Sequence, residues 1–255
     1  RLEPSRSLQV ARLENRLDRL FLRSLDKPTR IDDHDLGIIV FTTAGPNLTY
    51  LGAAGRSSAA QGTTCVHTFP LPFELWASKF EVGQQLASVD VRPLDRSSIP
   101  PQAKHRNRLH WYRADKEARS RFPTASALVT TPDGQITETS AGNILVVRGR
   151  SICTPPSDIV LSGISRQVAQ KFAEQLGFDW SEQRLTIDDL LNADEVLTSS
   201  TTYCLLPVTR VDDQTIGAGT PGPVFRELMA AWSDQVGVDI VQQAIDGARD
   251  REPQD

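Results

Sequence analysis

Apolar residues in the first part of the chain show first the spacing of a helix and then the continuous run of a buried strand. Leu13, Leu17 and Leu20 recur at the interval of a helix. The apolar run 36–43 (LGIIVFTT) is rich in β-branched residues and predicts a central strand, and 65–69 predicts a second one. The first part of the chain is therefore expected to contain both helix and sheet.

The second part of the chain shows clearer strand and turn signals. Residues 125–130 predict a strand, and Thr-Pro-Asp-Gly at 131–134 predicts a turn that leads into a second strand at 135–139. Residues 143–147 and 151–154 predict another hairpin around Arg-Gly-Arg. Two consecutive hairpins indicate that much of this part is antiparallel sheet.

Helical spacing returns further along the chain. Ile164, Val168, Phe172 and Leu176 recur every four residues, and Gly177 provides a stop. The other elements that the pattern predicts are a short helix opened by a capping box at 186–189, a strand at 195–198 and an amphipathic helix at 225–236, with a polar tail after Ile240 that is expected to fray.

These elements do not follow a strict strand–helix–strand rhythm, which favours an α+β architecture. The prolines at 70 and 72 stiffen the chain. We therefore expect a small N-terminal α/β domain at 1–72, a linker at 73–82 and a larger domain at 83–255. Because residues 1–3 resemble the second arm of a hairpin, one or two strands are expected to precede this sequence.

Composition excludes several classes of protein. The net charge is −4, apolar residues make up 39% and charged residues 24%, which is typical of a soluble globular protein without a general attraction to nucleic acid or membrane. No apolar run is long enough to cross a membrane. Three widely separated cysteines and four histidines without metal-ligand spacing argue against a disulfide framework or a bound metal and favour a cytoplasmic protein.

Four polar segments could together carry chemistry. Lys104 follows a proline-rich stretch, Glu138 ends a predicted strand, residues 162–166 (SGISR) open the strongest helix, and residues 198–202 (TSSTT) follow a strand. A helix N-terminus offers backbone N–H groups to an anion. Taken singly, each has an ordinary alternative, namely a surface charge, an N-cap serine or a polar loop.

Lys104 also lies in a basic and aromatic stretch, 104–113 (KHRNRLHWYR), that could bind nucleic acid. On a helix, however, these side chains would point all around the axis and form no single basic face. Acidic residues follow at once, at Asp115 and Glu117. Nucleic-acid binding is therefore the remote alternative.

The order and spacing of the segments resembles the class IV aminotransferases, which are fold type IV pyridoxal-phosphate enzymes. The resemblance is carried by a lysine shortly before an asparagine, T-E-x-x-x-x-N at 137–143, T-P-P at 154–156, G-I-S-R at 163–166, A-D-E-V at 193–196 and P-V at 207–208. It is strong over about residues 99–235 and weaker before them.

This resemblance implies a two-domain enzyme that binds pyridoxal 5'-phosphate between a small N-terminal domain and a larger barrel-like α+β domain, works as a homodimer and acts on amino acids and 2-oxo acids. Lys104 is then the Schiff-base lysine and Glu138 the partner of the pyridine nitrogen. The other implied site residues are Ile164, Ser165, Thr201 and Arg1 at the cofactor phosphate, Thr202 near the substrate carboxylate, and Arg108 beside the cofactor.

The segment around Lys104 departs from the branched-chain enzymes. Those carry K-x-x-x-N-Y, whereas here it is K-x-x-N-R-L, with Arg108 where the tyrosine would fall. This short form is closer to D-amino-acid aminotransferases and to aminodeoxychorismate lyase. Amino transfer is the expected reaction, and release of pyruvate from aminodeoxychorismate is the alternative.

Overall fold

A computed structural model describes residues 35–43, 45 and 62–250. The chain divides into two compact units, Arg1–Leu71 and Pro72–Asp255. The helix expected around Leu13, Leu17 and Leu20, the strands expected to precede the sequence and the site residue Arg1 lie outside the described residues.

In the first unit, the described residues form an antiparallel hairpin. Strand β1 spans Leu36–Thr42 and strand β2 spans Thr64–Pro70, with a regular register from Leu36↔Pro70 to Thr42↔Thr64. Side chains of β1 alternate between exposed and half-buried, as expected for a strand with one covered face. Both strands lie close to the ranges predicted from the sequence.

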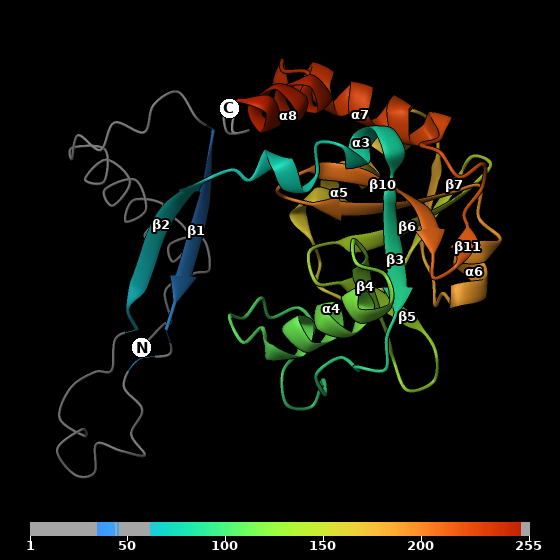
Figure 1. Cartoon of the computed structure of the whole chain (residues 1–255). Coiled ribbons are helices and arrows are strands. Elements are labelled where there is room, and N and C mark those ends of the chain that lie inside the picture. The colour runs from blue at the N-terminus through green and yellow to red at the C-terminus, as the bar shows by residue number, and fades with distance from the viewer. Residues whose placement is uncertain (1–34, 44, 46–61, 251–255) are drawn as a thin grey trace, which may run out of the picture. The chain divides into compact units, whose positions relative to one another are not determined.

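The second unit is built on a closed sheet (Figure 1). Strands β3, β4, β5, β6, β9 and β10 pair in a ring, because β9 pairs with both β6 and β10. Closure removes the unpaired edges of an open sheet. The strands are β3 Gln84–Ser88, β4 Ser126–Thr130, β5 Ile136–Thr139, β6 Asn143–Arg148, β7 Ser151–Thr154, β8 Asp179–Glu182, β9 Glu195–Ser200, β10 Cys204–Val211 and β11 Gln214–Thr215.

Helices cover the outside of this ring. Figure 1 shows α4 on one side of the sheet and α7 with α8 on the other. Helix α4 packs on β3 and β4, α5 on β8 and β9, and α7 on β9 and β10. The helical elements are η2 Phe73–Leu75, α3 Lys79–Val82, α4 Leu109–Arg121, α5 Ile164–Gln175, α6 Ile187–Leu191, α7 Pro223–Val236 and α8 Ile240–Arg249.

Every strand of the ring contributes to one interior cluster of buried side chains. Burial of this apolar surface supplies the main driving force that holds the ring closed. Alanines, by contrast, dominate the contact of α4 with β3 and β4, and their small side chains let the helix lie close to the sheet. The interior cluster includes Leu86, Leu128, Ile136, Ile144, Val146, Val196 and Val208.

Two segments differ from their predicted structure. Residues 73–82, expected as a linker, form η2 and α3, with Phe73, Trp76 and Phe80 buried in the second unit. The tail after Ile240 was expected to fray, and this prediction is wrong for residues 240–249, which form α8. That helix packs against η2, and Gly247 approaches the Phe73 ring so closely that a Cβ there would lie 2.4 Å from it.

Candidate active site

A cavity of about 290 Å³ opens in the second unit, between the outer face of the ring and the start of α5. This volume lies near the lower end of the range for small-molecule sites. The cavity brings together most of the site residues predicted from the sequence, namely Lys104, Arg108, Glu138, Ile164, Ser165 and Thr201. Thr202 does not line it, and its hydroxyl lies 3.3 Å from that of Ser200.

A register shift aims Glu138 into this cavity. In a regular strand, Glu138 would share a face with Ile136, which is buried in the interior cluster. The pairing of β4 with β5 shifts between Leu128 and Thr130, however, so Thr139 pairs with the interior residue Leu128. Glu138 therefore faces outward, as expected where an irregularity redirects a side chain beside a site.

The Glu138 carboxylate is largely enclosed but has hydrogen-bond donors. Its Oε2 accepts from Asn143 Nδ2 at 3.2 Å and from the backbone N–H of Leu161 at 3.3 Å. Burial raises the pKa of Glu138 from its ordinary 4.5 to about 7, against the opposing effects of the Leu161 N–H and of Lys104 and Arg108. A cation that binds beside this carboxylate would stabilise its ionised form.

Glu138 belongs to a row of polar side chains that crosses three neighbouring strands. Glu138 on β5 pairs with Asn143 on β6, and Asn143 pairs with Ser199 on β9. Paired residues project from the same face of a sheet, so all three side chains lie on the outer face. The row places an acid, an amide and a hydroxyl along the floor of the cavity.

The N-terminus of α5 lies over this row. Its N-cap is Gly163, which has extended backbone and lies so close to Asn143 that a Cβ would be 2.1 Å from Oδ1. The backbone N–H groups of Ile164 and Ser165 fall in the first helical turn, where no intrahelical acceptor is available. These groups and the Ser165 hydroxyl make the helix start suited to bind an anion.

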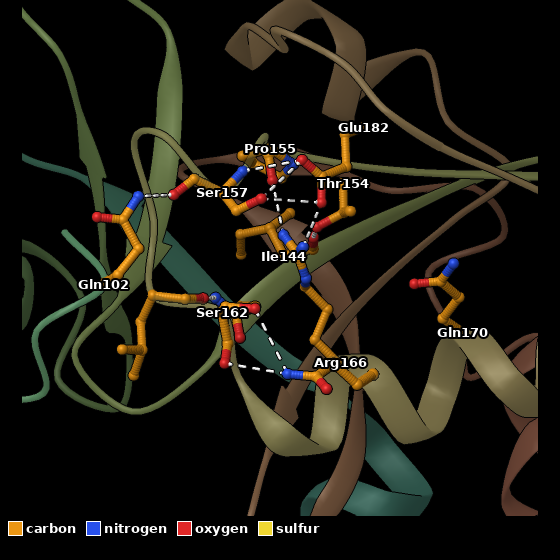
Figure 2. Close-up of polar contacts among 12 residues, drawn as sticks. Gln102, Ile144, Thr154, Pro155, Ser157, Ser162, Arg166, Gln170 and Glu182 are labelled. Carbon is orange, nitrogen blue, oxygen red and sulfur yellow. Dashed lines mark hydrogen bonds and ion pairs between the residues drawn. The ribbon is translucent and has the colours of Figure 1, made fainter. Parts of the chain in front are cut away.

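Arg166 fixes the first turn of α5 in place (Figure 2). Its guanidinium is buried, donates to the carbonyl of Pro155 at 3.0 Å and pairs with the carboxylate of Glu182. Glu182 also accepts from the N–H of Ser157 at 2.9 Å. Gln102, two residues before Lys104, donates to the carbonyl of Ser157. A continuous set of polar contacts therefore runs from α5 to the segment that carries Lys104.

The segment around Lys104 is more open than the strand side of the cavity. Lys104 and Arg108 are exposed, and Arg108 donates to the carbonyl of Ser140, with its Cζ 5.8 Å from the centre of the Trp111 ring. Burial, followed by the charges of His105 and Arg108, lowers the pKa of His110. Lys104 lines the same cavity as Glu138, and its charge acts on that carboxylate.

The sequence of the chain matches the model of a known protein family. The family model described as amino-transferase class IV matches residues 13–211. The chain is a member of this family. The resemblance predicted from the sequence motifs is therefore confirmed.

Individual relatives of this class IV chain are aminotransferases. The D-alanine aminotransferase of Bacillus licheniformis is 39% identical over 105 residues, which are 41% of this chain and 37% of that protein. The chain thus spans little more than a third of the length of this relative.

Solved structures share the fold. The branched-chain amino acid aminotransferase of Escherichia coli matches with a TM-score of 0.68 and 26% identity, over 78% of this chain and 64% of that one. A T.th. branched-chain amino acid aminotransferase with pyridoxamine 5'-phosphate matches with a TM-score of 0.68 and 25% identity, over 79% of this chain and 66% of that one. The predicted fold type IV, α+β architecture with a barrel-like sheet is confirmed.

Three residues that line the cavity received no individual role from the sequence. Asn143 and Gly163 were visible only as motif letters, and Ser199 only as part of a hydroxyl run. The motifs contained the signal for all three. Which of the hydroxyls at 198–202 faces the cavity, however, depends on the strand register.

The described parts of the chain contain neither a metal site nor a membrane-spanning helix. Among residues 35–43, 45 and 62–250, no group of three or more His, Cys, Asp or Glu side chains is placed to hold a metal ion. Within the same ranges, none of the helices has the length and apolar character needed to cross a membrane.

Proposed function

We propose that this chain is a pyridoxal-phosphate-dependent aminotransferase that moves an amino group between an amino acid and a 2-oxo acid. The observation that carries the proposal is one cavity that holds a lysine, a buried carboxylate and the open N-terminus of a helix. Membership of the class IV family and the pyridoxamine 5'-phosphate in a structural neighbour support it.

The residues of the cavity fit pyridoxal 5'-phosphate. The start of α5 offers the backbone N–H groups of Ile164 and Ser165 to the phosphate, and the Thr201 hydroxyl lines the same cavity. Gly163 lets the helix start approach the sheet closely. When bound, the cofactor links through its aldehyde to an amine, and its ring withdraws electrons from the substrate α-carbon.

Glu138 would accept a hydrogen bond from the protonated pyridine nitrogen. Without the cofactor, burial raises the pKa of Glu138 to about 7 despite the nearby charges of Lys104 and Arg108. A cation brought next to it lowers that pKa, so the carboxylate becomes fully ionised and keeps the nitrogen protonated. Asn143 and the Leu161 N–H hold the carboxylate oxygen in position for this contact.

Lys104 is proposed as the catalytic residue, which holds the cofactor and then moves the proton at the substrate α-carbon. It lines the same cavity as Glu138. Arg108, whose guanidinium holds the Ser140 carbonyl, positions the turn that follows Glu138. Arg1 at the phosphate and Thr202 near the substrate carboxylate remain proposals based on the resemblance.

The substrates are proposed from the names of the relatives. Those reported above are D-alanine and branched-chain aminotransferases, and none of them is named as a lyase, so amino transfer is preferred over pyruvate release. The test supplies purified protein and pyridoxal 5'-phosphate with D-alanine or L-leucine as donor and 2-oxoglutarate as acceptor. Glutamate formed from either donor supports the proposal. Pyruvate released from aminodeoxychorismate without amino transfer contradicts it.

Assembly and location are also part of the proposal. We propose a homodimer from the resemblance, and light scattering should give twice the chain mass of 28.1 kDa. The described cysteines, Cys65, Cys153 and Cys204, are free, and on this basis we propose a cytoplasmic location. Cell fractionation that finds the protein outside the cytoplasm would contradict this location.

A further inference from the structure

We propose that Ser199 is an additional ligand of the anion at the start of α5, and that its hydroxyl donates a hydrogen bond to an oxygen of the cofactor phosphate. This inference rests on the proposed function, because it takes the phosphate of pyridoxal 5'-phosphate as the anion. None of the sequence motifs assigned a role to Ser199.

Ser199 has a buried hydroxyl that lacks a partner. The residue is 2% exposed, and its Oγ makes no hydrogen bond within the described part of the chain. A buried donor without an acceptor is costly, and native proteins rarely leave one. An acceptor that enters the cavity would remove this cost.

The position of Ser199 on β9 aims its side chain at the cavity. It pairs with Asn143, so it projects from the outer face of the ring and lines the cavity with Ser165 and Thr201. Its neighbour Thr198 projects from the opposite face, and its hydroxyl oxygen accepts hydrogen bonds from Gln84 Nε2 at 2.5 Å and from the Tyr203 hydroxyl at 3.2 Å. The two adjacent hydroxyls therefore have different roles.

The start of α5 lies next to Ser199. Gly163 rests on Asn143, the direct neighbour of Ser199 across the sheet, and α5 packs on β9. Thr201 follows two residues later in the chain and lines the same cavity. Ser199 thus lies between the helix start and the turn that bears Thr201.

The groups around Ser199 favour an acceptor-rich anion. The backbone N–H groups of Ile164 and Ser165 donate, and the hydroxyls of Ser165 and Thr201 can do so too. Glu138, whose charge would repel an anion, is separated from Ser199 by the whole width of β6. A phosphate monoester offers several oxygens to such a set of donors.

The test compares Ser199→Ala with the control Thr198→Val, which removes a hydroxyl from the other face of the same strand. Affinities for pyridoxal 5'-phosphate, inorganic phosphate and pyridoxal are measured by calorimetry on cofactor-free protein. Ser199→Ala should weaken binding of both phosphate-bearing probes about tenfold to a hundredfold, because a hydrogen bond to a charged group is lost. Its affinity for pyridoxal should not change.

Thermal unfolding separates a binding role from a structural one. Removing an unpartnered hydroxyl should leave the Tm of cofactor-free Ser199→Ala unchanged or higher, whereas Thr198→Val should lower the Tm and keep the affinities. Unchanged affinity of Ser199→Ala for both phosphate-bearing probes overturns the inference, as does an equal loss for pyridoxal or a lower Tm. If wild-type protein binds inorganic phosphate through Ser199 but fails to bind pyridoxal 5'-phosphate, the proposed function fails and the anion contact stands.

Discussion

The two sides of the cavity are built in different ways. On one side, Glu138, Asn143 and Ser199 stand on paired strands whose register fixes their positions. On the other side, Lys104 lies in an irregular segment that is held through the contacts of Gln102 with Ser157 and of Arg108 with Ser140. Asn143 and Ser199 are buried and Glu138 is half-buried, whereas Lys104 and Arg108 are exposed.

This difference matches the work proposed for each side. The parts of a cofactor that stay fixed, its ring nitrogen and phosphate, are best held by groups whose positions do not change. Lys104, which is proposed to hold the cofactor and then to move the proton at the substrate α-carbon, needs conformational freedom. A loop on a rigid scaffold provides it. Damage to the strand side should therefore disturb the contacts to the cofactor ring and phosphate, whereas damage to the loop side should reduce the rate and leave the affinity for the cofactor unchanged.

The largest effect is expected from Glu138→Gln, which keeps the shape of the strand side and removes its charge. Aminotransferase activity should fall on the order of 10²-fold, because the ring nitrogen loses its ionised partner. Steady-state kinetics with saturating cofactor measure this. Glu81→Gln, on the exposed surface of α3, should behave like wild type. Wild-type activity in Glu138→Gln would show that the charge of Glu138 has no part in the reaction.

The same carboxyl should make stability depend on pH in the cofactor-free protein. Because the folded-state pKa of about 7 lies above the ordinary 4.5, the folded protein holds the proton more tightly than the unfolded chain does. The contribution of the protonated Glu138 carboxyl to the free energy of unfolding is therefore fully present below about pH 4.5. It is lost as the pH rises through 7, and the loss is on the order of 3 kcal/mol. Urea unfolding at a series of pH values should show this fall in wild type relative to Glu138→Gln. Parallel curves for the two proteins would contradict it.

A smaller effect is expected where α5 meets the strand side. In Gly163→Ala the new methyl group would lie 2.1 Å from Asn143 Oδ1, so the helix start must shift, at a cost of about 1–3 kcal/mol. Affinity for pyridoxal 5'-phosphate should fall about tenfold. Calorimetric titration measures it, with Lys171→Ala on the exposed face of α5 as the control. An unchanged affinity would show that the helix start does not hold the cofactor.

The smallest effect is expected from Gln102→Ala on the loop side. Loss of the hydrogen bond to Ser157 should lower kcat about threefold, since a single exposed hydrogen bond contributes on the order of 0.5–1 kcal/mol. KM and the affinity for pyridoxamine 5'-phosphate, which does not bond to Lys104, should stay the same. A matching loss of that affinity would mean that the two sides are not separate in function.

Local signals in the sequence were enough to predict much of the second unit. The turn at 131–134, the strands β4 to β7 and helix α5 follow from turn residues, alternation and helical spacing. The capping box at Thr186 is present, with Asp189 accepting from its backbone N–H at 2.8 Å. Such elements are specified by residues that are neighbours in the chain.

Elements that depend on distant partners were not predicted. Strand β3 lacks alternation, and it forms because it pairs in parallel with both β4 and β10. Helix α8 is fixed by contact with η2, about 170 residues earlier in the chain. The same holds in the site, where motifs indicated Lys104 and Glu138, but only the register of β9 against β6 distinguishes Ser199 from Thr198.

The most direct test of the central claim is the absorbance of purified protein after addition of pyridoxal 5'-phosphate and removal of the free cofactor. Wild-type protein should retain the visible band of a covalently held cofactor, and Lys104→Ala should lose that band while its circular dichroism stays that of wild type. A wild-type protein without the band, or a Lys104→Ala variant that keeps it, would contradict the assignment of Lys104.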